Sequence, residues 1–159
     1  MQYIPLKEYR YAWFFTHREM PVDEQTSMLI KPLCEADSNQ IWQQQISKKA
    51  NHPDLFAKDD WPSKHKTWQN EGQWQQQWES DASEMPDIVD QYIDWEDNII
   101  VYFCYHADHI IETRWDVFRA HWKNFLFLDN GPILLGKRRS QVLQFFQTGQ
   151  MKVGTKGEV

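Results

Sequence analysis

Cysteine is scarce in this sequence, and no apolar stretch is long. The two cysteines, Cys34 and Cys104, are too few for a disulfide framework, so we expect both to be free thiols. The longest strongly apolar run, 99–105, has seven residues, whereas a helix needs roughly 20 to cross a bilayer. The first residues also lack the basic and apolar segments of a secretory leader. We therefore expect a cytoplasmic protein that does not enter a membrane.

Aromatic residues, in contrast, are abundant. They make up 15% of the 159 residues and include nine tryptophans. Disordered chains lack such residues, so the composition predicts a folded chain, and the length suits one domain with an extensive core. We expect this domain to span residues 1–159, with a loop or hinge over 51–65 and a frayed tail over 154–159.

Signals for both helices and strands occur along the chain. The run 99–105 is typical of a central strand that is covered on both faces. Other segments fit strands at 11–16, 125–128, 133–135 and 151–153, and helices at 23–32, 38–46, 83–93, 113–122 and 140–147. One helical turn over 74–78 would place Trp74 and Trp78 on the same face. The pattern predicts an α+β fold, with a small, largely antiparallel sheet of four or five strands packed with four to five helices.

The charges are distributed unevenly. Although 17 Lys and Arg against 23 Asp and Glu give a net charge of -6, residues 114–159 hold eight basic and three acidic side chains. Residues 79–97 hold eight carboxylates and no Lys or Arg, and Asp87, Asp90 and Asp94 lie opposite the apolar stripe of the predicted helix. This acidic segment disfavours nucleic acid. It suits a basic protein partner, or else it pairs with the basic C-terminal part of its own chain.

A basic cluster, formed by Lys137, Arg138 and Arg139, lies between a predicted strand and a predicted helix. The N–H groups of a helix N-terminus, together with three cations, would suit a phosphate or a carboxylate. The segment lacks the second glycine of a phosphate-binding loop. The cluster therefore predicts a site for a small anionic ligand, with internal pairing to the acidic segment as the alternative.

Histidines and a carboxylate follow the predicted central strand. His106, His109 and Glu112 lie in what we expect to be a loop, and their side chains are of the types that ligate zinc. Their spacing matches no established metal motif, so a solvated polar loop without a cofactor is the favoured interpretation. Cys104 and His106 would share one strand face, but a buried thiol is normally inert.

Four tryptophans near the middle of the chain, Trp61, Trp68, Trp74 and Trp78, suggest a platform that stacks on bases or sugars. A platform for nucleic acid also needs a positive groove, whereas the acidic segment follows directly. We expect these tryptophans to lie in the core instead, because large aromatic side chains supply core area with few residues.

The last third contains Trp115-x-x-Phe118-x-x-x-Trp122, followed by Asp129-Asn-Gly-Pro and then by Gln144-Phe-Phe. These residues resemble a bacterial family that is known as a domain of unknown function, the one numbered 2947. The resemblance extends over most of the chain and implies a small bacterial cytoplasmic protein. It implies no activity, cofactor or functional residue.

Segregated charge without an assembled catalytic motif favours a binding function. We expect a non-enzymatic binding module that recognises a protein partner or a small anionic ligand, through Asp87, Asp90 and Asp94 or through the basic cluster. One alternative is an enzyme or metal-binding protein that uses the segment from His106 to Glu112. The other is a self-assembling structural protein with an aromatic interface. A monomer and a homodimer both fit the sequence.

Overall fold

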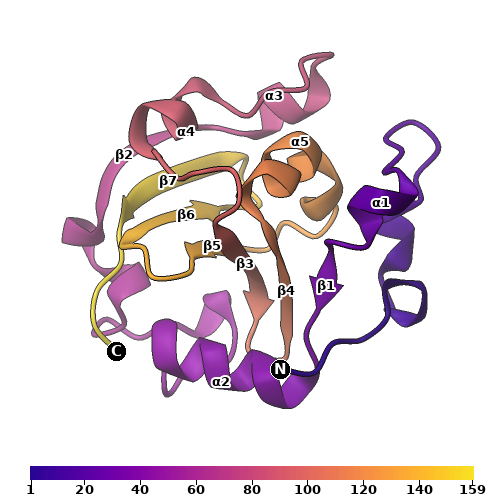
Figure 1. Cartoon of the computed structure of the whole chain (residues 1–159). Helices are drawn as coiled ribbons and strands as arrows, with labels where there is room; N and C mark the ends of the chain where they lie inside the picture. Colours follow the sequence, from indigo (N-terminus) through magenta and orange to yellow (C-terminus); the bar gives the residue numbers. More distant parts are fainter.

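The computed structural model describes all 159 residues, which form one seven-stranded sheet with helices on both faces (Figure 1). All neighbouring strands are antiparallel, in the order β1-β4-β3-β5-β6-β7-β2. The strands are β1 (Lys31–Pro32), β2 (Trp68–Gln73), β3 (Ile100–His106), β4 (His109–Arg114), β5 (Ile133–Gly136), β6 (Gln141–Phe145) and β7 (Gln150–Thr155). The antiparallel sheet was predicted, but the predicted count of four or five strands is wrong.

Five α-helices accompany the sheet. They are α1 (Glu24–Ser27), α2 (Glu35–Gln45), α3 (Gln75–Glu79), α4 (Asp87–Tyr92) and α5 (Trp115–Phe125). Five short 3-10 helices are also present: η1 (Leu6–Glu8), η2 (Ala12–Phe15), η3 (Pro53–Leu55), η4 (Trp61–Ser63) and η5 (His65–Thr67). The α+β class is thereby confirmed. None of the helices combines the length and the apolar composition that crossing a membrane requires.

The two faces of the sheet are covered by different elements, and the central strand β3 contributes to both. Val101, Phe103 and Tyr105 belong to the larger core, whereas Tyr102 and Cys104 point to the smaller core on the other face. In Figure 1, α5 lies above the sheet and α2 lies below it. All five residues are buried, which confirms the prediction of a central strand covered on both faces.

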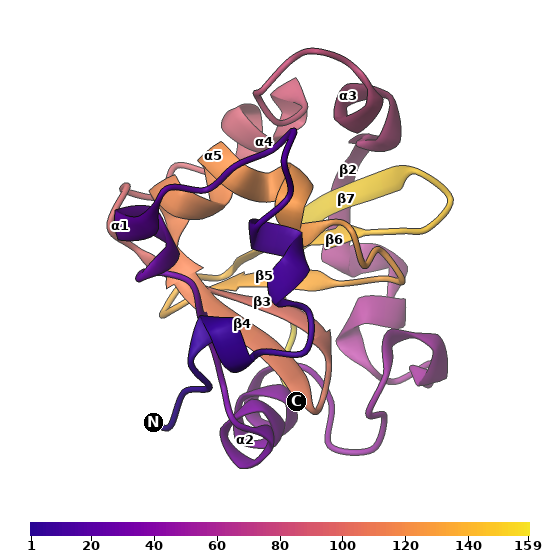
Figure 2. The same ribbon diagram turned by 90° about the vertical axis from the view of Figure 1, so that its right-hand side faces the viewer.

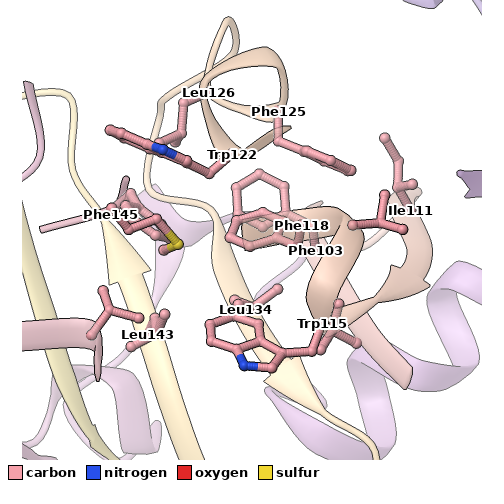
Figure 3. Close-up of a cluster of buried hydrophobic side chains, with 14 of the residues drawn as sticks. Phe103, Ile111, Trp115, Phe118, Trp122, Phe125, Leu126, Leu134, Leu143 and Phe145 are labelled. Atoms are coloured by element: carbon pink, nitrogen blue, oxygen red, sulfur yellow. The ribbon is translucent and has the colours of Figure 1, made fainter. Parts of the chain in front are cut away.

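Aromatic side chains form the centre of the larger core (Figure 3). Helix α5 buries Trp115, Phe118 and Trp122, which lie on one face at helical spacing. The ring centroid of Phe118 lies 5.1 Å from that of Phe103 and 5.0 Å from that of Phe125. These distances are typical of favourable aromatic pairs, so α5 is attached to the sheet mainly by ring packing.

The tryptophans near the middle of the chain lie in or against the two cores, as predicted: Trp74 and Trp78 in the larger core, Trp61 and Trp68 in the smaller one. Trp61 and Trp74 are buried, and Trp68 and Trp78 are half-buried. Each of the four indole N–H groups donates a hydrogen bond to a backbone carbonyl at 2.9 to 3.0 Å. These bonds fix the rings within the fold, because a buried indole N–H is costly to leave without an acceptor.

The strand expected at 11–16 is instead the 3-10 helix η2, which packs against α5. Its residues Phe14 and Phe15 are adjacent, and both are buried. A strand would direct these adjacent rings to opposite faces, whereas the 3-10 turn of η2 brings both into the larger core. Figure 2 shows this N-terminal segment beside the outer part of the sheet, with α1 next to it.

The helix expected at 140–147 is strand β6, and the strand expected at 125–128 is the end of α5 with the turn after it. In β6, Val142 and Leu143 are both fully buried because they face opposite cores. A short apolar run does not distinguish a strand covered on both faces from a buried helix. Because no strand directly precedes the Asp129-Asn-Gly-Pro turn, the chain forms no hairpin there, and β5 pairs with β6 instead.

Other expected elements have shifted ends. The helices at 38–46, 74–78 and 83–93 are present as α2, α3 and α4, and Asp23 caps α1 through the Thr26 N–H. The helix expected at 113–122 is α5, which begins at Trp115; Thr113 lies in β4, where its hydroxyl donates to the Leu29 carbonyl at 2.8 Å. The tail expected from 154 begins later, because β7 continues to Thr155.

Candidate functional site

A cavity of about 300 Å³ lies on the smaller-core face of the sheet, between α2 and the turn that joins β5 to β6. We call it the cationic pocket. Its charged and polar side chains come from α2, β3, the turn and the segment after β7, and they are Gln44, Gln45, Tyr102, Lys137, Arg138 and Lys156. Ile41 and Leu135 add apolar surface. The pocket therefore combines an apolar floor with several polar groups, as small-molecule sites commonly do.

The floor of the pocket is set by strand register. Tyr102 of β3 pairs with Leu135 of β5 on one side and with Glu112 of β4 on the other. The Tyr102 hydroxyl has no hydrogen-bond partner within the chain, although the side chain lines the pocket. Burial, with a contribution from the Glu112 charge, raises the pKa of Tyr102 to about 12. The phenol is therefore protonated at neutral pH and can donate to a ligand.

Two cations of the pocket lie in the turn between β5 and β6. The Lys137 N–H donates to the Ile100 carbonyl at 2.8 Å, and the Arg139 N–H donates to the Gly136 carbonyl at 3.0 Å. Arg138 has a φ of 59°, in the left-handed region that only a few non-glycine residues adopt. These bonds hold the turn, so Lys137 and Arg138 extend from a defined backbone.

The third cation is Lys156, which follows β7. Its N–H donates to the Ser140 carbonyl at 2.9 Å, and its ammonium group donates to the Gln45 side-chain carbonyl. The side chain is half-buried, and burial lowers the pKa of Lys156. Gln45 is neutral, so this ammonium group has no charged partner.

No carboxylate lines the cationic pocket. Glu112 is next to Tyr102 in the sheet, but its two carboxylate oxygens accept from the Tyr3 hydroxyl at 3.1 and 3.2 Å. Three cations and a free phenolic donor therefore surround one cavity without an internal anion. Such a site attracts an anion by charge and can bind it by charge-assisted hydrogen bonds.

The sequence predicted two of the residues that line this pocket, but as part of an anion site at a helix N-terminus. Lys137 and Arg138 line it, whereas Arg139 does not and instead donates to the Arg138 carbonyl at 3.1 Å. All three lie in a turn between strands, so the expected helix N-terminus is wrong. Tyr102 and Lys156 were missed, because their partners are brought near only by strand register and by the position of α2.

A larger groove, of about 620 Å³, lies between the N-terminal segment and the α1–β1 region. Ile4, Leu6 and Ile30 contribute apolar surface, while Lys7, Lys31 and Glu24 bring charges of both signs. This groove therefore does not select a ligand by charge, and we favour the cationic pocket as the functional site.

The acidic segment lies elsewhere. Asp90 of α4 and Asp97 form ion pairs with Arg119 at 3.5 and 3.9 Å, and Asp94 accepts a hydrogen bond from the Gln141 side chain at 3.2 Å. Asp87 is exposed. No salt bridge joins these carboxylates to Arg138 or Arg139. The expected pairing with the basic cluster is thus absent, whereas the alternative of pairing with the C-terminal part of the chain is met at Arg119 alone.

The residues considered as metal ligands do not gather. His109 and Glu112 are three positions apart on β4, so their side chains point to opposite faces of the strand. Residues 106–112 are the tip and the second strand of a hairpin, not the loop that the sequence suggested. No group of three or more His, Cys, Asp or Glu side chains in the structure could hold a metal ion.

His109 is instead enclosed by aromatic rings. Its ring centroid lies 4.3 Å from that of Tyr105 and 5.2 Å from that of Tyr11, and its Nε2 is hydrogen-bonded to the Tyr9 hydroxyl. His106 lies edge-on at 5.4 Å. Burial, together with His106, lowers the pKa of His109 to about 3. This imidazole is therefore neutral at physiological pH and joins the N-terminal segment to the sheet.

The fold and the pocket define a small α+β protein with one antiparallel sheet and a cationic cavity on one face. The chain belongs to the family described as "Protein of unknown function (DUF2947)", whose sequence profile matches residues 3–154. This match confirms the family resemblance seen in the sequence. No curated protein and no solved structure matched the chain.

Proposed function

We propose that this protein binds a small anionic ligand in the cationic pocket. The observation that carries the proposal is the composition of the cavity wall, where Lys137, Arg138 and Lys156 surround a space without any carboxylate. A phosphate or carboxylate placed there would meet cations on two sides and the free Tyr102 hydroxyl on the floor. Binding in a reducing, cytoplasmic compartment is part of the proposal, since both cysteines are free thiols.

Binding rather than turnover is the function that these residues support. General acid–base catalysis most often uses an imidazole, and no histidine or carboxylate lines the cavity, whose reactive groups are cations and one phenol. The histidines are elsewhere, since His109 is stacked between tyrosines and His106 is near the hairpin tip. The groups that remain are suited to holding a ligand.

Adjacent arginines provide a matched test of this proposal. Arg138 lines the cavity and Arg139 does not, so Arg138→Gln is expected to weaken binding of inorganic phosphate about tenfold, because a hydrogen bond to a charged group contributes about 1.5–3 kcal/mol. Arg139→Gln removes the same charge and is expected to change affinity by no more than about twofold. Affinity would be measured by NMR titration, following the backbone amides of residues 136–140.

Two results would contradict the proposal. One is a phosphate titration that leaves the amides of the β5–β6 turn unchanged. The other is an equal loss of affinity in the two arginine variants, because that would indicate attraction by net charge alone. Lys137→Gln offers a second position in the cavity wall and is expected to behave like the Arg138 variant.

We also propose the acidic segment as a second binding surface, for a basic protein partner. The observation that favours it is that Asp87 and Asp94 are exposed and have no cationic partner, whereas Asp90 is paired with Arg119. Arg138 and Arg139 do not pair with these carboxylates. The negative electrostatic potential of the surface can therefore attract a cationic partner.

Replacement of two carboxylates tests this second surface. The double variant Asp87→Asn and Asp94→Asn is expected to weaken binding of a lysine-rich peptide about twofold to tenfold at low salt, since each exposed ion pair contributes about 0.2–1 kcal/mol. A control with the same charge change, Glu8→Gln and Glu19→Gln, lies on the N-terminal segment, where both side chains are exposed. Fluorescence anisotropy would measure affinity. Equal effects of the two double variants would remove the reason for this proposal.

A further inference from the structure

Lys156 combines partial burial with a place in the wall of the cationic pocket. Its Nζ reaches the cationic pocket from a half-buried side chain and donates only to the neutral Gln45 amide. Lys49, in contrast, pairs with Asp59 at 3.3 Å, and Lys137 is exposed at the rim of the same cavity. A lysine that is partly desolvated and lacks a carboxylate is more easily deprotonated than an exposed lysine.

We propose that the Lys156 amine forms a reversible imine with an anionic carbonyl compound held in the cationic pocket. The ligand class is a small carboxylate or phosphate that also carries an aldehyde or ketone. This inference rests on the proposed anion-binding function and adds a covalent contact to it.

The residues of the pocket can contact each part of such a ligand. Lys137 and Arg138 on the turn would hold the anionic end, while the carbonyl group would face Lys156, which lines the same cavity. Tyr102 on the floor has a free hydroxyl that can donate to the carbonyl oxygen, which polarises the carbon for attack. The apolar surfaces of Ile41 and Leu135 leave room for an uncharged body.

Imine formation requires only the lysine amine and the carbonyl compound. The neutral amine adds its lone pair to the carbonyl carbon, and a carbinolamine forms. The carbon–oxygen bond then breaks, and the oxygen leaves as one water molecule that carries the two hydrogens of the amine. A carbon–nitrogen double bond remains, and addition of water reverses the sequence. A lowered lysine pKa favours the first step because it raises the fraction of neutral amine.

Trapping with a reductant tests the proposal directly. The protein would be incubated with glyoxylate, which carries an aldehyde next to a carboxylate, and with sodium cyanoborohydride, which reduces an imine to a stable amine. Peptide mapping by mass spectrometry would then locate the added carboxymethyl group. We expect Lys156 to carry more label than any other lysine at early times. Equal labelling of all exposed lysines would overturn the proposal.

Two comparisons establish whether the cavity causes the selectivity. Arg138→Gln is expected to slow glyoxylate labelling of Lys156 about twofold to fivefold, as expected for loss of one partly screened charge pair, and to leave labelling by propionaldehyde unchanged. Lys152→Arg, a matched change of a half-buried lysine on β7, is expected to leave Lys156 labelling unchanged. Equal labelling of Lys156 by glyoxylate and propionaldehyde would contradict an anionic ligand.

A ligand without a carbonyl group separates this inference from the proposed function. Glycolate has the carboxylate of glyoxylate with a hydroxyl in place of the aldehyde. If glycolate or phosphate shifts the amides of the β5–β6 turn but glyoxylate does not label Lys156 selectively, anion binding stands and the imine is wrong. If neither anion shifts those amides, the proposed function itself fails. The variant Lys156→Arg retains a cation and is expected to bind glycolate without forming an imine.

Discussion

Replacement of Phe118 by alanine is expected to lower the free energy of unfolding by about 3–5 kcal/mol, the usual cost of deleting a fully buried phenylalanine ring. Phe118 has no exposed surface and lies among the rings of Phe103, Phe125 and Phe145. The cavity left behind would be enclosed by other aromatic side chains, which cannot easily collapse into it. For a chain of this length the midpoint of thermal unfolding should fall by about 10 °C.

An aromatic residue at the surface provides the control. Trp13 is 51% exposed, so Trp13→Ala is expected to cost no more than about 1 kcal/mol. Phe118→Leu should lie between the two, because leucine fills part of the space. Urea unfolding followed by tryptophan fluorescence and by circular dichroism would measure all three variants. Equal costs at positions 118 and 13 would show that ring packing on α5 does not stabilise the fold.

Acidification is expected to destabilise the protein through His109. The folded protein lowers the pKa of this imidazole from its ordinary value of 6.5 to about 3. The unfolded chain therefore binds a proton more readily than the folded chain, and the stabilisation is complete only above about pH 6.5. It declines as the pH falls from 6.5 towards 3, by up to about 1.4 kcal/mol per pH unit. The physical reason is that burial among aromatic rings penalises the charged imidazolium, and the neighbouring His106 adds to this effect.

A variant without the titrating group isolates this contribution. His109→Gln retains an acceptor for Tyr9 but does not titrate, so its loss of unfolding free energy between pH 7 and pH 4.5 should be smaller than that of the wild type by about 2 kcal/mol. His65→Gln, at an exposed histidine, should behave like the wild type. Urea unfolding at both pH values would measure the difference. A His109 variant that loses as much stability as the wild type would contradict the assignment.

The elements that could be predicted from the sequence are those with a long or one-sided pattern. Strand β3 is a continuous run of β-branched and aromatic residues, and α5 repeats large aromatic residues at helical spacing. Strand β6 was missed because both of its faces are buried, which removes the alternation that identifies a strand. Strand β2 was missed because its residues are mainly exposed and polar, so no hydrophobic period marks it.

The candidate site was predictable to a similar degree. Lys137 and Arg138 could be predicted as binding residues because they are consecutive cations next to a glycine. Tyr102 and Lys156 carry no such local signal, and 54 positions separate them. The successive pairings of β3 with β5, β5 with β6 and β6 with β7 bring them to one cavity, together with the placement of α2. Long-range register of this kind is not encoded in any short segment.

The coverage of both sheet faces also has an evolutionary consequence. The strands that form the floor of the cationic pocket are clamped from behind by the aromatic rings on α5, whereas the rim is made by a turn and by one side of α2. Substitutions at the rim can therefore diversify ligand preference among relatives at little cost in stability. Substitutions in the larger core, on the opposite face, would instead destabilise the sheet and with it the whole pocket. Selection should therefore tolerate substitutions at the rim of the pocket much more readily than substitutions in the larger core.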